Sequence, residues 1–333
     1  MRAVVKRSRS PRDVVVTDVP QPAPAPGEVL VRAEAVGLCG SDVHAWKQDS
    51  GYEWVTSPVV LGHEAVGVVE AVAGDVDPAW IGRRIVPISI DGCGSCQVCA
   101  ADRRHICPDR RVLGLSFDGA AADYFTIGVE RLVAVPPDVP ADALVLTEPL
   151  AIAAHAVEQL NRSADGRARE IVVTGPGPIG IMAAMLLDRY GHRVTLVGVA
   201  RDEPVRLSTA AGLGLRTSHA DDIGHKPSLW LEASGSGAAL DRALKDIAVG
   251  GTVVVPAMFS RIPSFNINTV TRHELRILGS YGATRADYQH AAAAIEKDPD
   301  RWLRLTTSFP LPQGIAALHA IERGAVVKAI LIP

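Results

Sequence analysis

Four of the five cysteines of this chain of 333 residues lie within residues 93–107. They follow the spacing C-x2-C-x2-C-x7-C, as Cys93, Cys96, Cys99 and Cys107. One folded loop with this spacing can hold four thiolates around a tetrahedral zinc ion. The segment lacks the apolar periodicity expected of four unrelated buried thiols, whereas an iron–sulfur cluster fits the spacing as well. Because four protein ligands leave no open position, we expect a structural metal here. The reactive centre is then expected in another part of the chain.

A second pattern, G-x-G-x-x-G, lies in the stretch IVVTGPGPIGIMAAMLLDRYG. It follows an apolar strand and precedes a helix, the context in which such glycines bind a dinucleotide. The first glycine makes a tight turn, the second admits the pyrophosphate, the third allows close helix packing, and the helix N-terminus binds the anion. A glycine- and proline-rich turn without a ligand is the alternative. The residues expected at the cofactor are Gly175, Gly177, Pro178, Ile179 and Gly180.

The choice between NAD and NADP depends on the end of the next strand, in RVTLVGVARDE. NAD enzymes usually have an acidic residue there, about 20 residues beyond the glycines, that binds the ribose 2′-hydroxyl. This chain instead has Gly198 followed by Arg201, which suits a 2′-phosphate and slightly favours NADP. Asp202 and Glu203 follow directly, so NAD stays open as the alternative.

Two further stretches contain residue types that bind metals. They are GLCGSDVH at residues 37–44 and LGHEAVG at residues 61–67. Separately, neither is decisive, because a buried structural thiol or a core histidine is the commoner fate of such a residue.

Composition limits the class of protein. With 47% hydrophobic and 21% charged residues, the chain is long enough for a sizeable core and for two domains. Lys and Arg number 34 against 37 Asp and Glu, so charge favours neither nucleic acid nor a membrane surface, and we expect a small-molecule substrate. The sequence predicts no leader and no spanning helix. We expect a cytoplasmic protein, whose thiols stay reduced and bind metal.

The secondary-structure pattern that must position these residues changes along the chain. In the first part, short β-rich runs divided by Gly, Asp and Pro predict a barrel-like or sheet-rich region, with a strand at about residues 28–37. From about Ala151, strands alternate with amphipathic segments of helix length, the pattern of a parallel, doubly wound sheet. We therefore predict an α/β protein with two kinds of domain.

Taken in order, these motifs, TEPLA at residues 147–151 and the ending KAILIP resemble the zinc-dependent medium-chain dehydrogenases. The likeness covers nearly the whole chain and is closest to the sorbitol, threonine and related polyol dehydrogenases. It implies a GroES-like catalytic domain formed by residues 1–151 and 286–333, a Rossmann domain at 152–285, and an active site in the cleft between them. It also implies a homo-oligomer, a dimer or a tetramer.

The resemblance further implies roles for particular residues. Its C-G-S-D, G-H-E and E-P-L motifs assign to the catalytic zinc Cys39, His63, Glu64 and Glu148. Such a set leaves a position for water or substrate, and either glutamate can instead orient a ligand from outside. Ser41 and His44 occupy the positions through which the family passes the alcohol proton to water. Ordinary loop polarity is the alternative for this last pair.

The implied reaction is hydride transfer between a secondary alcohol, such as a polyol, sugar or cyclitol, and NAD(P), with zinc as Lewis acid. One alternative keeps the enzyme but takes a biosynthetic intermediate such as an amino sugar. In another, the four-cysteine segment holds the only zinc and reduction is zinc-free. The last is a nucleotide-binding sensor or scaffold without turnover. We expect two zinc ions per chain, whereas zinc-free reduction would leave one.

Overall fold

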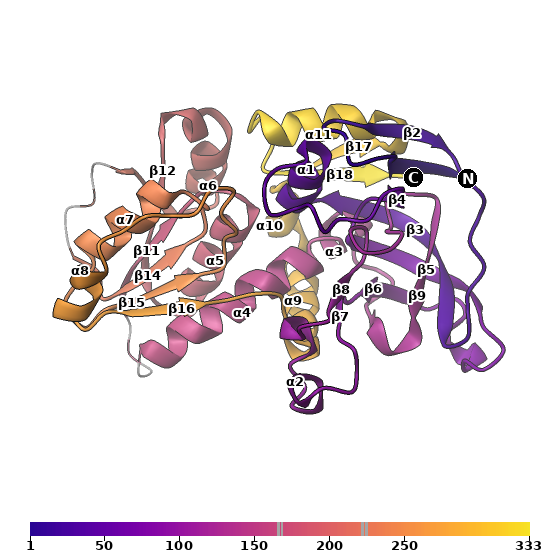
Figure 1. Cartoon of the computed structure of the whole chain (residues 1–333), viewed down its shortest axis with the longest axis horizontal. Helices are drawn as coiled ribbons and strands as arrows, with labels where there is room; N and C mark the ends of the chain where they lie inside the picture. The colour runs from indigo at the N-terminus through magenta and orange to yellow at the C-terminus, as the bar shows by residue number, and fades with distance from the viewer. Residues whose placement is uncertain (165–166, 168, 221–222, 224–225) are drawn as a thin grey trace. The chain divides into compact units, whose positions relative to one another are not determined.

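The computed structural model describes residues 1–164, 167, 169–220, 223 and 226–333. Its contacts divide the chain into two units. Unit 1 consists of Met1–Glu148 and Thr284–Pro333, and unit 2 consists of Pro149–Ala283. Figure 1 shows the path of the chain, with both termini in unit 1.

Unit 1 is rich in antiparallel strands. Its strands are β1 (Arg2–Lys6), β2 (Val14–Asp18), β3 (Glu28–Leu38), β4 (Val59–Val60), β5 (Glu64–Val72), β6 (Arg84–Pro87), β7 (Ile90–Asp91), β8 (Arg111–Val112), β9 (Tyr124–Gly128), β10 (Leu132–Ala134), β17 (Thr306–Pro310) and β18 (Lys328–Ile332). The larger sheet has the order β10-β6-β5-β3-β18-β17, with β9 also paired to β3, and a smaller one the order β2-β1-β4. The strand expected at about residues 28–37 is thus β3, whose Val, Leu and Ala side chains are mostly buried.

The central strands of unit 1 bring distant parts of the chain into register. β3 pairs antiparallel with β5, placing Gly37 opposite Glu64. β18, at the C-terminus, pairs with the other edge of β3 and places Ile330 opposite Gly37. Residues from β3, β5 and β18 therefore meet at one point of the sheet.

The helices of unit 1 connect or cover the strands. They are α1 (Gly40–Lys47), α2 (Gln97–Ala100), α3 (Ala141–Leu144), α9 (Arg285–Lys297), α10 (Pro299–Leu303) and α11 (Gly314–Glu322). α1 follows β3 directly, and its third residue, Asp42, accepts a hydrogen bond from the N–H of Cys39, the residue before the helix. That contact satisfies one of the free N–H groups at the helix start. α9 is capped in the same way by Thr284 and Asp287.

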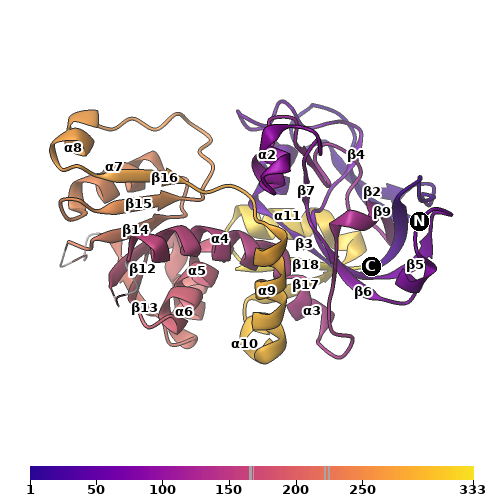
Figure 2. The same cartoon turned by 90° about the horizontal axis from the view of Figure 1, so that it is seen from below.

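Unit 2 contains a parallel sheet with the strand order β13-β12-β11-β14-β15-β16. The strands are β11 (Glu170–Thr174), β12 (Arg193–Gly198), β13 (Arg216–His219), β14 (Leu229–Glu232), β15 (Thr252–Val255) and β16 (Arg276–Gly279). The helices are α4 (Thr147–Ser163), which begins in unit 1, α5 (Pro178–Arg189), α6 (Ser208–Gly212), α7 (Gly237–Asp246) and α8 (Ile267–Arg272). The order reverses at β11, so right-handed connections place α5 and α6 on one face and α7 and α8 on the other, as Figure 2 shows.

The buried strands of unit 2 explain its core. Trp230 on β14 is fully buried and packs with Val172 on β11 and Val253 on β15. Apolar residues cover both faces of these strands, as a doubly wound parallel sheet requires. The predicted α/β class, with a β-rich part and a doubly wound parallel sheet, is therefore confirmed. Among the described residues, no helix has both the length and the apolar character needed to cross a bilayer.

Candidate active site and metal centres

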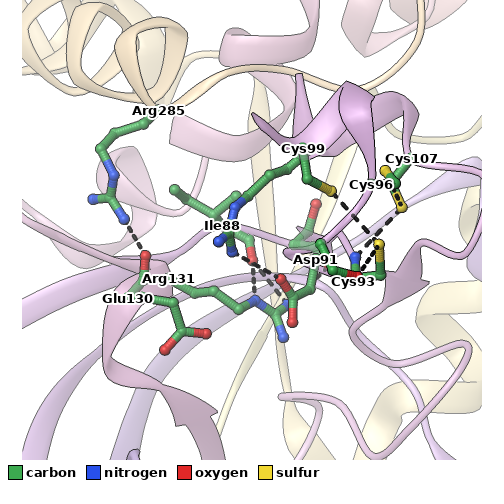
Figure 3. A network of polar contacts seen from close by, with 12 residues as sticks. Ile88, Asp91, Cys93, Cys96, Cys99, Cys107, Glu130, Arg131 and Arg285 are labelled. Carbon is green, nitrogen blue, oxygen red and sulfur yellow. Dashed lines mark hydrogen bonds and ion pairs between the residues drawn. The ribbon is translucent and has the colours of Figure 1, made fainter. Parts of the chain in front are cut away.

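The four thiols of residues 93–107 converge in unit 1. Their sulfur atoms all lie within 4.8 Å of one another, with Cys93 Sγ 4.0 Å from Cys99 Sγ and Cys96 Sγ 3.8 Å from Cys107 Sγ. Tetrahedral zinc with bonds of about 2.3 Å holds its sulfur ligands about 3.8 Å apart. Figure 3 shows the sulfurs facing one another. This spacing fits a single zinc ion and leaves no room for the iron and sulfide atoms of a cluster.

The base of this four-cysteine lobe is closed by a short strand pair. β7 and β8 flank the lobe, and they pair Ile90 with Val112 and Asp91 with Arg111. Within the lobe, N–H groups and the Ser95 hydroxyl near the exposed thiol of Cys93 lower its pKa to about 6. The thiolate, which is the form that binds metal, is therefore available at neutral pH.

A second group of possible metal ligands is formed by Cys39, His63 and Glu64. Their ligand atoms lie within 4.8 Å of one another. Cys39 lies between β3 and α1, while His63 and Glu64 lie at the start of β5. His63 and Glu64 are buried, and Cys39 is partly exposed. The fold thus brings together a thiol, an imidazole and a carboxylate from two separate segments.

Asp42 ties these two segments together. It is fully buried, and its Oδ2 accepts the N–H of Cys39 at 2.8 Å while its Oδ1 accepts the N–H of Gly62 at 3.2 Å. The same Oδ1 lies 3.8 Å from Nδ1 of His63. Burial raises the pKa of Asp42, while the charge of His63 and the two N–H groups oppose the rise. Asp42 thereby fixes the chain on both sides of the metal-ligand group.

Glu64 forms a buried ion pair with Lys328 of β18. Both side chains are almost completely buried, at 0% and 2% exposure. A Cβ at Gly37 would overlap the Glu64 carboxylate and lie 3.1 Å from Cε of Lys328, so the glycine makes room for the pair. Burial lowers the pKa of Lys328, but Glu64, Cys39 and Glu148 outweigh it and raise the pKa above its usual value. Lys328 therefore stays charged.

Glu148 lies beside this group rather than within it. It is not among the residues whose ligand atoms converge within 4.8 Å, and its Oε1 accepts a hydrogen bond of 2.8 Å from Ser89 Oγ. Burial raises its pKa to about 7, with Glu64 adding to the rise and His63 and Ser89 opposing it. The carboxylate is thus held at the edge of the metal-ligand group by a hydroxyl.

The charges around His63 show whether the metal-ligand group suits a cation. Burial by itself lowers the pKa of His63, but Asp42, Cys39 and Glu148 outweigh burial and raise it well above its usual value. Both carboxylate oxygens of Glu64 are buried without a hydrogen-bond partner, apart from the ion pair to Lys328. The surroundings therefore stabilise positive charge, and a metal ion would take the place of the imidazole proton.

Ser41 and His44 lie on α1, next to the group. Ser41 Oγ is 3.3 Å from Nε2 of His63. His44 is half-exposed, pairs through Nδ1 with Oδ2 of Asp49 at 2.7 Å, and stacks on Tyr52 with ring centres 5.1 Å apart. One residue of the expected proton path therefore lies at His63, and the other, one helical turn along, reaches solvent.

The glycine pattern forms the turn from β11 to α5 in unit 2. Gly175 has φ +90°, a conformation that L side chains rarely adopt, and a Cβ at Gly180 would overlap the carbonyl oxygen of Gly175. A Cβ at Gly177 would meet no atom within 4 Å, so the backbone there is open to a ligand. Pro178 begins α5, with Ile179 and Gly180 in its first turn. The N-terminus of α5 therefore begins at a turn with open space beside Gly177, an arrangement that suits a pyrophosphate.

The end of β12 shows why Gly198 is small. A Cβ there would lie 2.9 Å from Cγ of Pro176 and 3.1 Å from a methyl of Leu207, so packing alone requires the glycine. Asp202 is buried and accepts the N–H of Val199. Of the remaining candidates for contact with the ribose, Glu203 pairs with His219 at 3.2 Å and Arg201 is exposed.

Several residues that surround the metal-ligand group were not predicted from the sequence. They are Asp42, Ser89, Tyr288 and Lys328. Asp42 lies inside the C-G-S-D motif and Lys328 begins KAILIP, so family motifs in the sequence already mark both positions. For Ser89 and Tyr288, nothing nearby in the sequence marks a role.

Comparison with known proteins identifies the family. The alcohol dehydrogenase GroES-like domain matches residues 25–137, and the glucose dehydrogenase C-terminus matches residues 141–331. Sorbitol dehydrogenase of Halalkalibacterium halodurans is 28% identical, over 100% of this chain and 99% of that protein. An L-threonine 3-dehydrogenase of Chelativorans sp. is 30% identical, over 98% of both chains.

Solved structures agree in fold. Acetophenone reductase of Geotrichum candidum, solved in complex with NAD, is 25% identical and has a TM-score of 0.87 over 100% of this chain and 97% of that one. The GroES-like and Rossmann character expected from the sequence is therefore confirmed. The chain belongs to the zinc-type medium-chain dehydrogenases, in the branch of the sorbitol and threonine dehydrogenases.

Proposed function

We propose that this enzyme transfers a hydride between a secondary alcohol of the polyol, sugar or amino-alcohol type and a nicotinamide dinucleotide. The observation that carries the proposal is the convergence of Cys39, His63 and Glu64, with Glu148 beside them. Three side chains leave an open position, whereas the four-cysteine lobe leaves none. Sorbitol and threonine dehydrogenases among the relatives support substrates with a secondary hydroxyl.

Each residue of the group has a proposed role. Cys39 and His63 bind a catalytic zinc, and Glu64 or Glu148 completes the set. When bound, this zinc polarises the alcohol oxygen as a Lewis acid, while the nicotinamide accepts the hydride. The Asp42 carboxylate, 3.8 Å from Nδ1 of His63, supplies negative charge beside the imidazole. Lys328 balances the charge of Glu64, so that two glutamates and a thiolate can share one buried region.

The alcohol proton must pass from the mostly buried metal-ligand group to solvent. Ser41, 3.3 Å from His63, is placed to receive it, and His44 to release it to water. His44 suits the second step because it is half-exposed and an imidazole can accept a proton on one nitrogen and donate one to water. The Asp49 carboxylate engages Nδ1 of His44, which leaves Nε2 as the nitrogen for the transfer.

The four-cysteine lobe is proposed as a structural zinc site bound by Cys93, Cys96, Cys99 and Cys107. Unit 1 is proposed as the catalytic domain and unit 2 as the dinucleotide-binding domain, with pyrophosphate at Gly175, Gly177 and Gly180. Free thiols at every cysteine and thiolate metal sites support a reducing, cytoplasmic compartment.

NADP is the preferred cofactor in this proposal. Arg201 is exposed beyond β12, where a 2′-phosphate binds, while Asp202 and Glu203 already have partners in the chain. Arg201→Ala is expected to lower kcat/KM for NADP and to leave kcat/KM for NAD nearly unchanged. Equal effects on both cofactors would contradict a preference for NADP that depends on Arg201.

A homo-oligomer is also proposed. β16 is the last strand in its sheet order, and its Ile277 is exposed, as are Ile262 and Ile267 nearby in sequence. An exposed strand edge with apolar residues is a surface that a second copy can cover. Sedimentation or light scattering distinguishes a dimer or tetramer from a monomer.

The proposal is tested by a panel of alcohols with NAD and NADP, followed by absorbance at 340 nm. Polyols, secondary alcohols, L-threonine and cyclitols form the first set, and amino sugars the second. Turnover with any of the first set supports the proposal as stated. Turnover with amino sugars alone identifies a specialised intermediate as substrate. A silent panel with two bound zinc ions and tight dinucleotide binding would contradict the proposal and favour a sensor.

A further inference from the structure

Ser89 links the metal-ligand group to the rest of unit 1. It lies between β6 and β7 and is 1% exposed. Its hydroxyl is 2.8 Å from Glu148 Oε1 and 3.1 Å from Tyr288 Oη, and its N–H is 3.1 Å from the same Tyr288 oxygen. Tyr288, on α9, is also fully buried, at 1% exposure. A serine, a tyrosine and a glutamate from three distant parts of the chain therefore form one buried network.

The direction of these hydrogen bonds follows from counting protons. The Ser89 hydroxyl has one hydrogen, and it donates this hydrogen to the Glu148 carboxylate. The bond between Ser89 Oγ and Tyr288 Oη must then have the phenol as donor, and a phenol keeps its proton at neutral pH. The same phenol oxygen accepts the N–H of Ser89. The chain thus runs from Tyr288 through Ser89 to Glu148, and each bond in such a chain strengthens the next.

Arg131 fixes the backbone on which Ser89 sits. Its Nε and Nη2 donate to the carbonyl of Ile88 at 3.0 and 2.9 Å, and Nη2 also donates to the carbonyl of Ser89 at 3.0 Å. Figure 3 shows this guanidinium at the Ile88 carbonyl, with Asp91 and the cysteines beyond it and Arg285 on the Glu130 carbonyl. Because Arg131 is buried, these contacts are not exchanged for water. The Ser89 hydroxyl is therefore held in one position.

We propose that Ser89 is a positioning residue that fixes the Glu148 carboxylate at the metal-ligand group, and that Tyr288 and Arg131 hold Ser89 for this task. The proposal rests on the function proposed above. Since Ser89 engages Oε1, Oε2 is the oxygen of Glu148 available to a cation. Without the Ser89 hydroxyl, the carboxylate can rotate and its distance to the cation is no longer fixed. Groups that orient ligands in this way commonly change metal affinity 10- to 100-fold when removed.

The experiment compares four variants by their metal binding. Ser89→Ala removes the hydroxyl, Ser89→Thr keeps it, and Tyr288→Phe removes only the phenol oxygen. Ser308→Ala is the matched control, because the Ser308 hydroxyl also donates to a carboxylate, that of Asp142, at 2.9 Å. Zinc affinity is measured by chelator competition. The signal of the four-cysteine zinc is determined separately in Cys39→Ser and subtracted.

We expect about tenfold weaker zinc binding at the Cys39 group in Ser89→Ala, a smaller loss of about threefold in Tyr288→Phe, and wild-type affinity in Ser89→Thr and Ser308→Ala. After cobalt substitution, the visible spectrum of the Cys39 site, taken as the difference from Cys39→Ser, should change in Ser89→Ala and return in Ser89→Thr. A purely structural serine would not alter this spectrum. Circular dichroism confirms that each variant is folded.

Unchanged zinc affinity and cobalt spectra in both Ser89→Ala and Tyr288→Phe would overturn the positioning role and leave the proposed function intact. Should Ser89→Ala fail to fold, Tyr288→Phe decides the matter, since the ring still fills its place. A wild-type chain that binds zinc only in the four-cysteine lobe would instead overturn the proposed function, and the positioning role with it. The two failures are therefore distinguishable.

Discussion

The two sulfur-containing groups of unit 1 are built in opposite ways. The four thiols of the lobe come from one continuous segment, residues 93–107, and Cys93 is exposed. The second group combines Cys39, before α1, with His63 and Glu64 at the start of β5, and most of it is buried. The first group supplies four like ligands and is complete by itself. The second can supply three mixed ligands and would then leave a position open, which is what catalysis by a metal requires.

The second group also concentrates charge that a stable core would avoid. Asp42, Glu64, Glu148 and Lys328 are all buried, and their pKa values or ion pairs depend on one another. Burying charges in this way gives little net stability. Clusters of mutually perturbed ionisable groups are typical of functional sites. The difference between the two groups therefore supports the proposed division, with a structural metal in the lobe and a catalytic metal at the second group.

The largest effect is expected from Cys39→Ser. Loss of a zinc ligand removes Lewis-acid stabilisation of several kcal/mol, so turnover should fall by about 1,000-fold or more. Zinc content should fall from two ions to one per chain, and the melting temperature should change little. The 340 nm assay, metal analysis and calorimetry measure these three quantities. Activity close to wild type in Cys39→Ser would contradict a catalytic role for the second group.

Cys99→Ser is the converse change, in the four-cysteine lobe. Cys99 is buried, and loss of a structural metal is among the substitutions that cost about 4 kcal/mol or more. We expect a melting temperature lower by roughly 10 °C, with a smaller effect on kcat at low temperature than in Cys39→Ser. Calorimetry on matched zinc-loaded samples checks this. A variant as stable as wild type, with one zinc lost, would contradict a structural role for the lobe.

Lys328→Met tests the buried charges beneath the second group. It leaves Glu64 as a buried carboxylate without its partner, which typically destabilises a protein by about 3 kcal/mol or more. Combining it with Glu64→Gln should restore much of the stability, since neither charge then remains. Lys245→Met, which removes an exposed ion pair with Asp241, is the control and should have little measurable effect. Equal denaturation midpoints for the Lys328 and Lys245 variants would refute the account of the buried pair.

The same contrast explains what the sequence alone could predict. The four-cysteine lobe was recognisable because all its ligands lie in one short segment with metal-binding spacing. The glycine turn was recognisable because strand, turn and helix follow one another directly. Cys39, His63 and Glu64 needed a family pattern, since separate segments supply them. That pattern led to the right family and fold, whereas the roles of its residues stay predictions.

The residues around the second group could not be inferred, because only the folded sheet brings them together. Ser89 is 59 residues from Glu148 and 199 from Tyr288 in the chain, and Lys328 reaches Glu64 through the pairing of β3 with β18 and β5. Gly198 shows another limit: it was expected at the cofactor because it is small and precedes Arg201, and Pro176 and Leu207 also leave no space for a Cβ there. Local sequence does not reveal such packing.

The central claim is that this chain holds two zinc ions, one closed by thiolates and one open at the mixed group. Anomalous diffraction at the zinc edge, from crystals of the purified protein, tests it most directly. The account predicts one peak among Cys93, Cys96, Cys99 and Cys107 and a second between Cys39 and His63, beside Glu64. A single peak in the four-cysteine lobe, with none between Cys39 and His63, would contradict it.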